Sequence, residues 1–104
     1  MRCQKLFEKG CIGGVEIRNR VAMTAMGNGL ASWDGEASPE LIRFYEDRAR
    51  GGCGLIFTEF TRMDETSGAC NPNQLCIATR KHIRSTERVR CHGARIFVQL
   101  YHVG

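Results

Sequence analysis

The chain has 104 residues, a length that fits one small domain. Its hydrophobic content of 42% and charged content of 25% are ordinary for globular proteins and exclude an intrinsically disordered chain. The net charge of +4 is too small to indicate nucleic-acid binding by itself, and no apolar run reaches the roughly 18 residues of a membrane span.

The cysteines bear on redox state and metal binding. Six of them occur, at positions 3, 11, 53, 70, 76 and 91. They form no C-x-x-C pair and no histidine falls at the spacing of a zinc ligand, so we predict no metal site. Because no signal peptide precedes them, we expect free, reduced thiols and a cytoplasmic protein, with a disulfide framework as the weaker alternative.

The first predicted strand covers 21–26, the short apolar run VAMTAM. It follows the polar EIRNR and ends at Gly27-Asn28-Gly29, which favours a turn. A polar loop over 31–37 comes next.

Ser38-Pro39 predicts the start of a helix, with serine as the N-cap and proline at the first helical position. Glu40 falls in the first turn, where a carboxylate suits the positive end of the helix dipole. Gly51-Gly52 ends the helix. The predicted apolar face comprises Leu41, Ile42, Phe44, Tyr45 and Ala49.

The alternation of strands and helices continues to the end of the chain. We predict a strand over 54–60, a long polar loop over 61–76, a helix over about 80–91 and a strand over 94–100. The order β-α-β-α-β is typical of a parallel α/β sheet. Long connections after strands and short ones before them favour the front of a (β/α)₈ barrel. A Rossmann half would need G-x-G-x-x-G after its first strand, which MTAMGNG does not supply.

Three ordered segments carry a family resemblance: LFEKGCIGGVEIRNRVAMTAMG, FYEDRARGGCGLIFTEFTRMD and HGARIFVQLYHVG. They resemble the N-terminal part of the old yellow enzyme family, in the branch of NADH:flavin oxidoreductases, 2-enoate reductases and 2,4-dienoyl-CoA reductases. The resemblance implies the N-terminal β-α-β-α-β portion of a (β/α)₈ TIM barrel. Residues 1–104 would then be the incomplete first part of a single FMN-binding domain.

The resemblance also implies a function, that of an FMN-dependent NAD(P)H oxidoreductase of the ene-reductase type. Such enzymes use NAD(P)H to reduce FMN and then reduce activated C=C bonds in enoate or enoyl substrates. This chain would supply part of the flavin-binding barrel and no catalytic residue. The family's substrate-binding pair, proton-donating tyrosine and phosphate-binding residues all belong to later parts of the barrel.

The resemblance places Thr24, Ala25, Met26 and Gly27 against the flavin ring. Ala25 and Gly27 have little side chain, which lets the backbone approach a flat ring closely. The residues alone favour a plainer alternative, in which this stretch is tight packing at the mouth of a barrel.

Gln99 is the most specific candidate for cofactor binding. Its amide, within the apolar run IFVQL, presents up to four hydrogen-bonding positions. In the family, the glutamine of QLxHxG meets the carbonyl and the N–H of the flavin's pyrimidine edge. On the residues alone, a glutamine bonded within the barrel core is an equal alternative.

Two positions depart from the family pattern. Phe60 replaces a small residue that contacts the flavin, and its ring would crowd the cofactor or force a shift. Gly29 lies at a substrate-facing position where some members have a tyrosine, so we expect that contact to be missing. Glu59 is predicted to be a buried, paired structural carboxylate, and His102 a hydrogen-bonded structural side chain.

Two other functions stay open. Three strands of a barrel have open edges, so the chain is alternatively an inactive fragment that associates with itself or with a complementary chain. The third possibility is a small module that binds nucleic acid or an acidic partner. It rests on a cluster of basic residues, which the solvated outer face of a helix would explain better. The cluster comprises Arg80, Lys81, Arg84, Arg88, Arg90 and Arg95.

Overall fold

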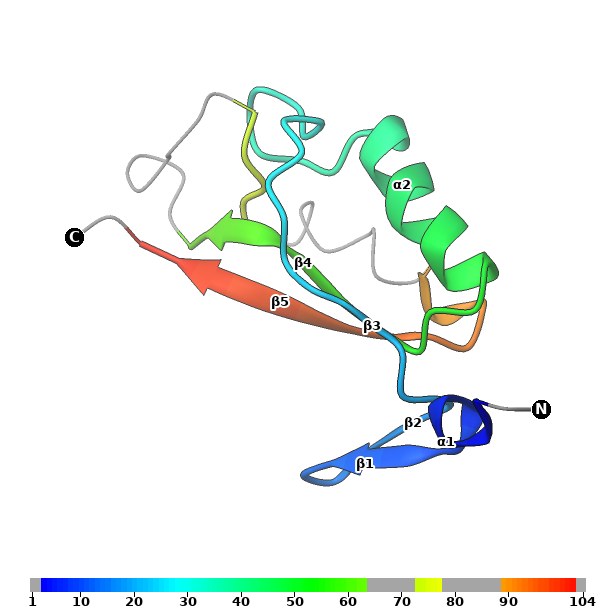
Figure 1. Ribbon diagram of the computed structural model, residues 1–104. Helices are drawn as coiled ribbons and strands as arrows, with labels where there is room; N and C mark the ends of the chain where they lie inside the picture. Colours follow the sequence, from blue (N-terminus) through cyan, green and yellow to red (C-terminus); the bar gives the residue numbers. More distant parts are fainter. Residues whose placement is uncertain (1–2, 64–72, 78–88, 103–104) are drawn as a thin grey trace.

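The computed structural model describes residues 3–63, 73–77 and 89–102 (Figure 1). A sheet of three parallel strands lies at its centre, in the order β3-β4-β5. These strands are β3 (Ala22–Met23), β4 (Leu55–Arg62) and β5 (Arg95–Tyr101). Helix α2 (Pro39–Arg50) connects β3 to β4 and covers one face of the sheet, as the predicted alternation requires.

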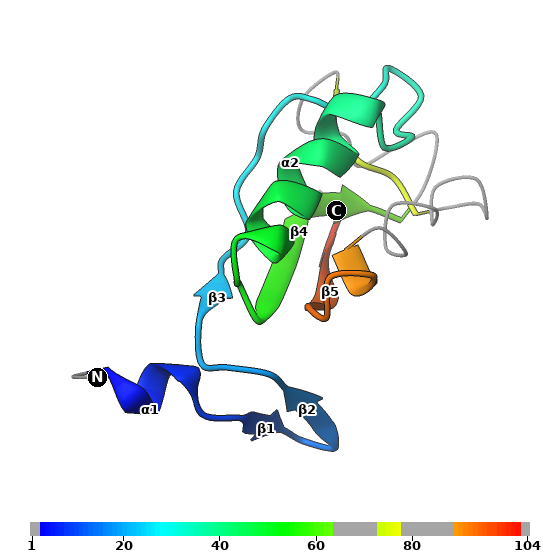
Figure 2. The same cartoon turned by 90° about the vertical axis from the view of Figure 1, so that its right-hand side faces the viewer.

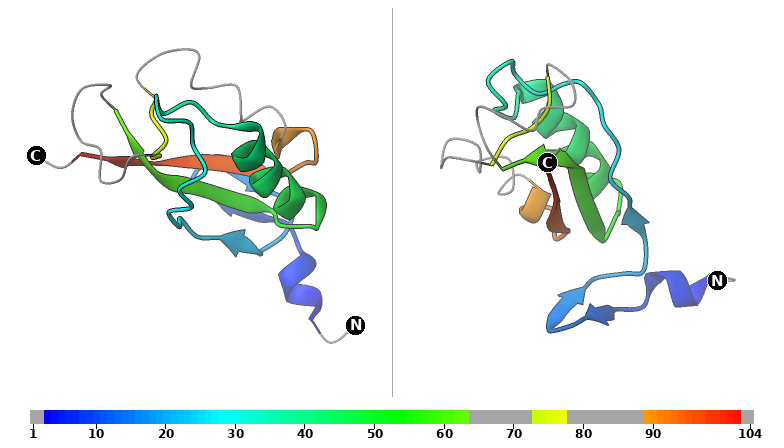
Figure 3. Two further views of the ribbon diagram at one scale, coloured as in Figure 1. Left: turned by 90° about the horizontal axis from the view of Figure 1, so that it is seen from above. Right: turned by 90° about the vertical axis from the view of Figure 1, so that its left-hand side faces the viewer.

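A small N-terminal unit precedes the sheet and was not predicted. It consists of helix α1 (Gln4–Phe7) and an antiparallel hairpin of β1 (Gly10–Ile12) and β2 (Val15–Ile17). Its two-residue turn is Gly13-Gly14, and Gly13 has a φ of 59°, a left-handed conformation that glycine adopts readily. The unit lies beyond the amino end of the sheet, on the side away from α2 (Figures 2 and 3).

β3 is much shorter than the predicted strand over 21–26. Only Ala22 and Met23 pair with β4, opposite Leu55 and Ile56. After Met23 the chain leaves the sheet, and its next hydrogen bond to β4 is made to a side chain and not to the backbone. The backbone N–H of Asn28 donates to the Glu59 carboxylate at 2.9 Å.

β4 is longer than predicted and ends at Arg62 rather than at residue 60. Its last residues have a further neighbour, the segment 73–77, which the sequence assigned to a loop. The N–H of Arg62 donates to the carbonyl of Leu75 at 2.9 Å, and the N–H of Ile77 donates to the carbonyl of Arg62 at 2.9 Å. β5 is shifted by one residue from its predicted range of 94–100.

Helix α2 begins and ends as predicted. The Ser38 hydroxyl accepts the N–H of Leu41 at 3.1 Å, and the N–H of Gly51 donates to the carbonyl of Asp47 at 2.9 Å. On the predicted apolar face, three residues are buried and two, Ile42 and Phe44, are only half-buried. The buried residues are Leu41, Tyr45 and Ala49. The helix therefore meets the sheet along a narrower stripe than the sequence indicated.

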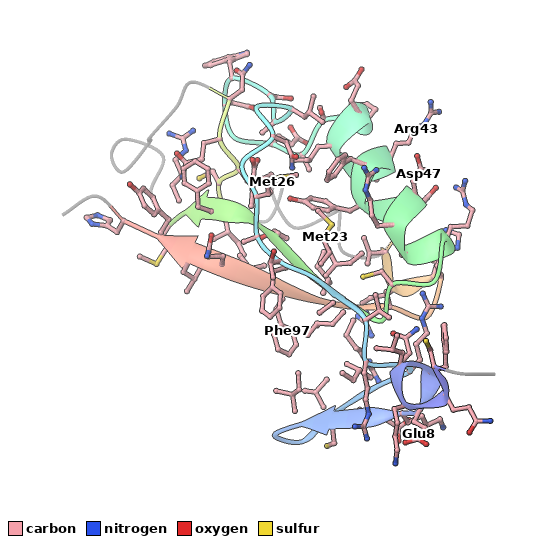
Figure 4. The ribbon with its side chains drawn as sticks, in the orientation of Figure 1. Glu8, Met23, Met26, Arg43, Asp47 and Phe97 are labelled. Carbon is pink, nitrogen blue, oxygen red and sulfur yellow. The ribbon has the colours of Figure 1, made fainter. Side chains whose placement is uncertain are left out.

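The hydrophobic core lies between α2 and the sheet. Met23, Ile56 and Ile96 share one register row and pack on the α2 side. Figure 4 shows Met23 on that side and Phe97 on the opposite face. The buried core residues are Ala31, Leu41, Tyr45, Ala49, Ile56, Leu75, Val89 and Ala94.

The second predicted helix, over about 80–91, falls mostly outside the described residues. Val89 and Arg90 are helical, and a turn at 91–93 follows them. Gly93 has a φ of 84°, and Arg95 begins β5 two residues later. The predicted stop at Gly93 and the short connection into the last strand are therefore present.

Candidate functional site

The carboxyl ends of the three parallel strands bring three predicted site residues together. Phe60 on β4 pairs in register with Gln99 on β5. The ring of Phe60 also lies against Gly27, so closely that a Cβ added to Gly27 would be 2.6 Å from the ring atom Cε1. A register shift between Phe57 and Phe60 precedes this contact.

Tyr101 completes this group and was not predicted. Its ring meets that of Phe60 edge to face, with centroids 5.2 Å apart and planes at 87°. Tyr101 follows Gln99 by two residues, which places both side chains on the same face of β5. That strand periodicity is the signal that would have found it.

The other predicted site residues line the path from β3 to this group. Thr24 and Met26 are exposed, with 57% of Met26 accessible, and Ala25 is half-buried. Figure 4 shows Met26 on the segment that leaves β3 and passes the end of β4. Gly29 is exposed with a φ of 68°, and no described atom lies within 4 Å of the position a Cβ would take.

The side chain of Gln99 is exposed at the end of the sheet. The alternative of a glutamine bonded within the barrel core stays a prediction. An exposed amide at a strand end has a donor and an acceptor available to a ligand.

Glu59 lies on β4 next to this group, and only 1% of the residue is exposed. Its Oε2 accepts the N–H of Asn28 at 2.9 Å, and its Oε1 accepts the N–H of Leu75 at 3.3 Å. Burial raises the pKa of the Glu59 carboxyl, although hydrogen bonds from the backbone of Asn28, Leu75 and Gly29 act in the opposite direction. The expected burial is confirmed, and the bonds identified here come from backbone amides.

Tyr45 of α2 lies next to this carboxylate. Its hydroxyl oxygen accepts the backbone N–H of Glu59 at 2.8 Å. Burial raises the pKa of Tyr45 to about 12, and the nearby charge of Glu59 contributes to the increase. Helix α2 is thereby linked to the strand residue that holds the loop after β3.

Within residues 3–63, 73–77 and 89–102, no group of three or more His, Cys, Asp or Glu side chains is arranged to hold a metal ion. In the same part of the chain, no helix has the length and apolar character needed to cross a membrane. The five described cysteines, Cys3, Cys11, Cys53, Cys76 and Cys91, carry free thiols.

Comparison with known proteins decides the family. The sequence profile of the NADH:flavin oxidoreductase / NADH oxidase family matches residues 5–104. The chain belongs to this family. Its predicted resemblance to the old yellow enzymes is thereby confirmed, in the branch that the three sequence segments indicated.

Curated members of the NADH:flavin oxidoreductase family match nearly the whole chain. An NADH oxidase of Thermoanaerobacter brockii is 41% identical over 103 residues, which cover 95% of this chain and 16% of the relative. A cinnamate reductase of Clostridium sporogenes is 37% identical over 105 residues, with coverage of 91% and 16%. The chain therefore spans about one sixth of the length of these two relatives.

A solved structure gives the fold of this part of the family. The structure of Old Yellow Enzyme from Pichia sp. AKU4542 matches with a TM-score of 0.86 at 26% identity, over 96% of this chain and 27% of that chain. The predicted fold class is confirmed, because the chain corresponds to the N-terminal portion of a (β/α)₈ barrel. The comparisons do not test the individual site residues, which stay predictions.

Proposed function

We propose that residues 1–104 form the first part of a single FMN-binding barrel domain in an NAD(P)H oxidoreductase of the ene-reductase type. The observation that carries this proposal is the meeting of Gly27, Phe60 and Gln99 at the carboxyl ends of β3, β4 and β5. In (β/α)₈ barrels the functional groups gather at that end. Family membership gives the cofactor class, FMN with NAD(P)H as its reductant.

The polar groups of the site fit the flavin. Gln99 offers a carbonyl and an NH₂ group from an exposed position, which suits a pyrimidine edge that presents both an N–H and a carbonyl. The stretch from Thr24 to Gly27, exposed except at the half-buried Ala25, would supply backbone for one side of the ring. The space directly over Gly27 does not fit, since the ring of Phe60 fills it.

The role of this chain is to bind and orient. FMN, when bound, supplies hydride transfer between NAD(P)H and an activated alkene. Gln99 would fix the pyrimidine edge, and Glu59 would hold the loop at Asn28 by its 2.9 Å bond. We assign no general acid to this chain.

The substrate class in the proposal is a small enoate or enoyl compound. The name of the cinnamate reductase relative, 37% identical to this chain, supports that class. Gly29 leaves open space at the substrate-facing position, so this chain would make no side-chain contact there. We also propose a cytoplasmic location, because the described cysteines carry free thiols.

Flavin binding tests the proposal directly. The purified chain is titrated with FMN and followed by the visible absorption bands of oxidised flavin. Gln99→Leu removes both the donor and the acceptor, and Gln99→Glu removes the donor. We expect each substitution to weaken FMN binding about tenfold or more, because Gln99→Glu loses one hydrogen bond to the flavin and Gln99→Leu loses two.

Gln4→Leu is the matched control, because Gln4 is an exposed glutamine on α1, at the far end of the molecule. It should leave the affinity for FMN unchanged. A folded wild-type chain that never binds FMN would exclude flavin binding by this chain alone. Equal affinities in the Gln99 and Gln4 variants would remove Gln99 from the site.

Two alternatives from the sequence stay predictions. Of the basic cluster, Arg80, Lys81, Arg84 and Arg88 lie outside the described residues. Arg90 and Arg95 line a groove that also contains Lys9 and Glu16. Self-association of the chain would be seen as a dimer or larger species in sedimentation, and nucleic-acid binding as an affinity that falls steeply with salt.

A further inference from the structure

We infer that the aromatic side chain of Phe60 lowers the affinity of this chain for its cofactor. The Phe60 ring fills the space beside the Gly27 backbone. A flavin ring can occupy that space only if it displaces the Phe60 ring from its contact with Tyr101. The inference rests on the proposed function, since it takes FMN as the ligand. It goes beyond that proposal by identifying a residue that opposes FMN binding and the contact through which it does so.

The contact between Phe60 and Gly27 is close on three ring atoms. A Cβ at Gly27 would lie 2.6 Å from Cε1 and 3.5 Å from both Cδ1 and Cζ. Carbon atoms in contact prefer separations of about 3.5–4.0 Å. The ring edge of Phe60 therefore already occupies the volume on the Cβ side of Gly27, which a flat ligand stacked on that side would need.

The backbone of Phe60 is held in place from the other side. Its carbonyl accepts a hydrogen bond from Nε2 of Gln74 at 3.1 Å, and Gln74 is 1% exposed. The residue is also paired with Gln99 across the ladder. A ligand can therefore displace the ring by side-chain rotation more readily than by moving the strand.

The ring itself is held more weakly. It is half-buried and meets Tyr101 edge to face at 5.2 Å. Displacing it breaks one aromatic pair and exposes the ring to water. The apparent affinity for a flat ligand is reduced accordingly, because only the population with the ring displaced is competent to bind.

The test is an FMN titration followed by the quenching of flavin fluorescence. We expect Phe60→Ala to bind FMN about threefold to tenfold more tightly than the wild-type chain, since the variant has no aromatic pair to break. Phe57→Ala is the matched control. Phe57 is on the same strand and meets Phe97 edge to face at 5.7 Å and 89°, so its removal costs a similar contact. It should not tighten binding.

A second measurement does not depend on flavin. Gly27 is not among the glycines with positive φ, so Gly27→Ala is resisted by the Phe60 ring rather than by backbone strain. We expect Gly27→Ala to lower the melting temperature of the wild-type chain and to have a much smaller effect in the Phe60→Ala background. Equal effects in both backgrounds would overturn the inference, because the ring would not then fill the space over Gly27.

The possible failures are distinguishable. If the wild-type chain binds FMN and Phe60→Ala binds it no more tightly, the inference is wrong and the proposed function stands. If both chains are folded and neither binds FMN, flavin binding by this chain alone is excluded and the inference falls with it. Tightening by Phe57→Ala to the same degree would also overturn the inference, since the effect would not be specific to the ring at Gly27.

Discussion

The two ends of the parallel sheet are held in different ways. At the amino end, side chains that immediately precede β3 bind the backbone of other segments directly. Arg18 donates from Nη2 to the carbonyls of Ala49 at 2.5 Å and Cys53 at 2.8 Å, and from Nη1 to the carbonyl of His92. Asn19 donates from Nδ2 to the carbonyl of Gly52 at 2.6 Å.

At the carboxyl end, the Glu59 carboxylate holds the start of the loop after β3. Glu59 accepts the N–H of Asn28, while Thr24, Met26 and Gly27 around it are exposed. The difference separates the two tasks of a barrel sheet. The amino end fixes the order of strands and helix by dense polar contacts, and the carboxyl end leaves backbone and side chains available to a ligand.

The largest effect is expected from breaking the amino end. Arg18→Ala leaves three backbone carbonyls without their charged donor, and each such bond contributes about 1.5–3 kcal/mol. We expect the free energy of unfolding to fall by about 3–6 kcal/mol, less than the sum of three such bonds because the half-buried side chain leaves water able to replace part of them. That is a large part of the stability of a small domain. Urea denaturation followed by circular dichroism measures it.

Arg20→Ala is the control for the loss of an arginine in the same segment. Arg20 is exposed and forms a surface ion pair with Glu8 at 3.9 Å. Such pairs contribute about 1 kcal/mol or less. Comparable losses in the Arg18 and Arg20 variants would contradict the assignment of the amino end as the firmly held one.

The elements that could be predicted from the sequence are those with strong local signals. Ser38-Pro39 and Gly51 define helix α2 by local chemistry, since a cap and a stop act within one turn. β4 and β5 are long enough for their apolar runs to be recognised. The hairpin of β1 and β2 was missed because its strands have three residues each, although Gly13-Gly14 is a hairpin signal.

The site was predictable only in part for a related reason. Gly27 and Gln99 lie within short motifs, so a resemblance was enough to select them. The contact of Phe60 with Gly27 depends on the register shift after Phe57 and on the way the chain leaves β3 at Met23. Those are tertiary features, and no local pattern of residues specifies them.

The carboxyl end is tested by removing its carboxylate. Glu59→Ala leaves the N–H groups of Asn28 and Leu75 without their acceptor. We expect a loss of about 2–4 kcal/mol in the free energy of unfolding at neutral pH, smaller than for Arg18→Ala because removing the buried carboxylate also removes its cost of desolvation. Hydrogen exchange should show faster exchange at Asn28 and little change at Leu55, which lies at the amino end of β4.

Glu59→Gln adds a pH dependence with a definite sign. Burial raises the pKa of Glu59 above 4.5, so its contribution to stability is fully present below about pH 4.5 and is lost as pH rises through the folded-state pKa. The glutamine variant does not titrate. Its stability relative to wild type should therefore improve as pH rises from about 4.5. A wild-type advantage that grows with pH would show that the amide bonds outweigh burial and lower the pKa.

The smallest effect is expected at the link between α2 and the carboxyl end. Tyr45→Phe removes the oxygen that accepts the Glu59 N–H at 2.8 Å and leaves that buried N–H without its partner. We expect a loss of about 1–2 kcal/mol at neutral pH, measured by urea denaturation.

The destabilisation by Tyr45→Phe should disappear at alkaline pH, because the Tyr45 hydroxyl itself loses its proton there. Burial raises the pKa of Tyr45 from 10.0 to about 12, so the stability associated with its neutral form is present below pH 10 and is lost as pH rises from 10 to about 12. Phenylalanine has no proton to lose, and the rise from 10.0 to about 12 corresponds to roughly 3 kcal/mol, more than the wild-type advantage. The two free energies of unfolding should therefore converge and then cross over that range. Parallel pH curves for the two chains would mean that the hydroxyl titrates normally and is not buried against Glu59.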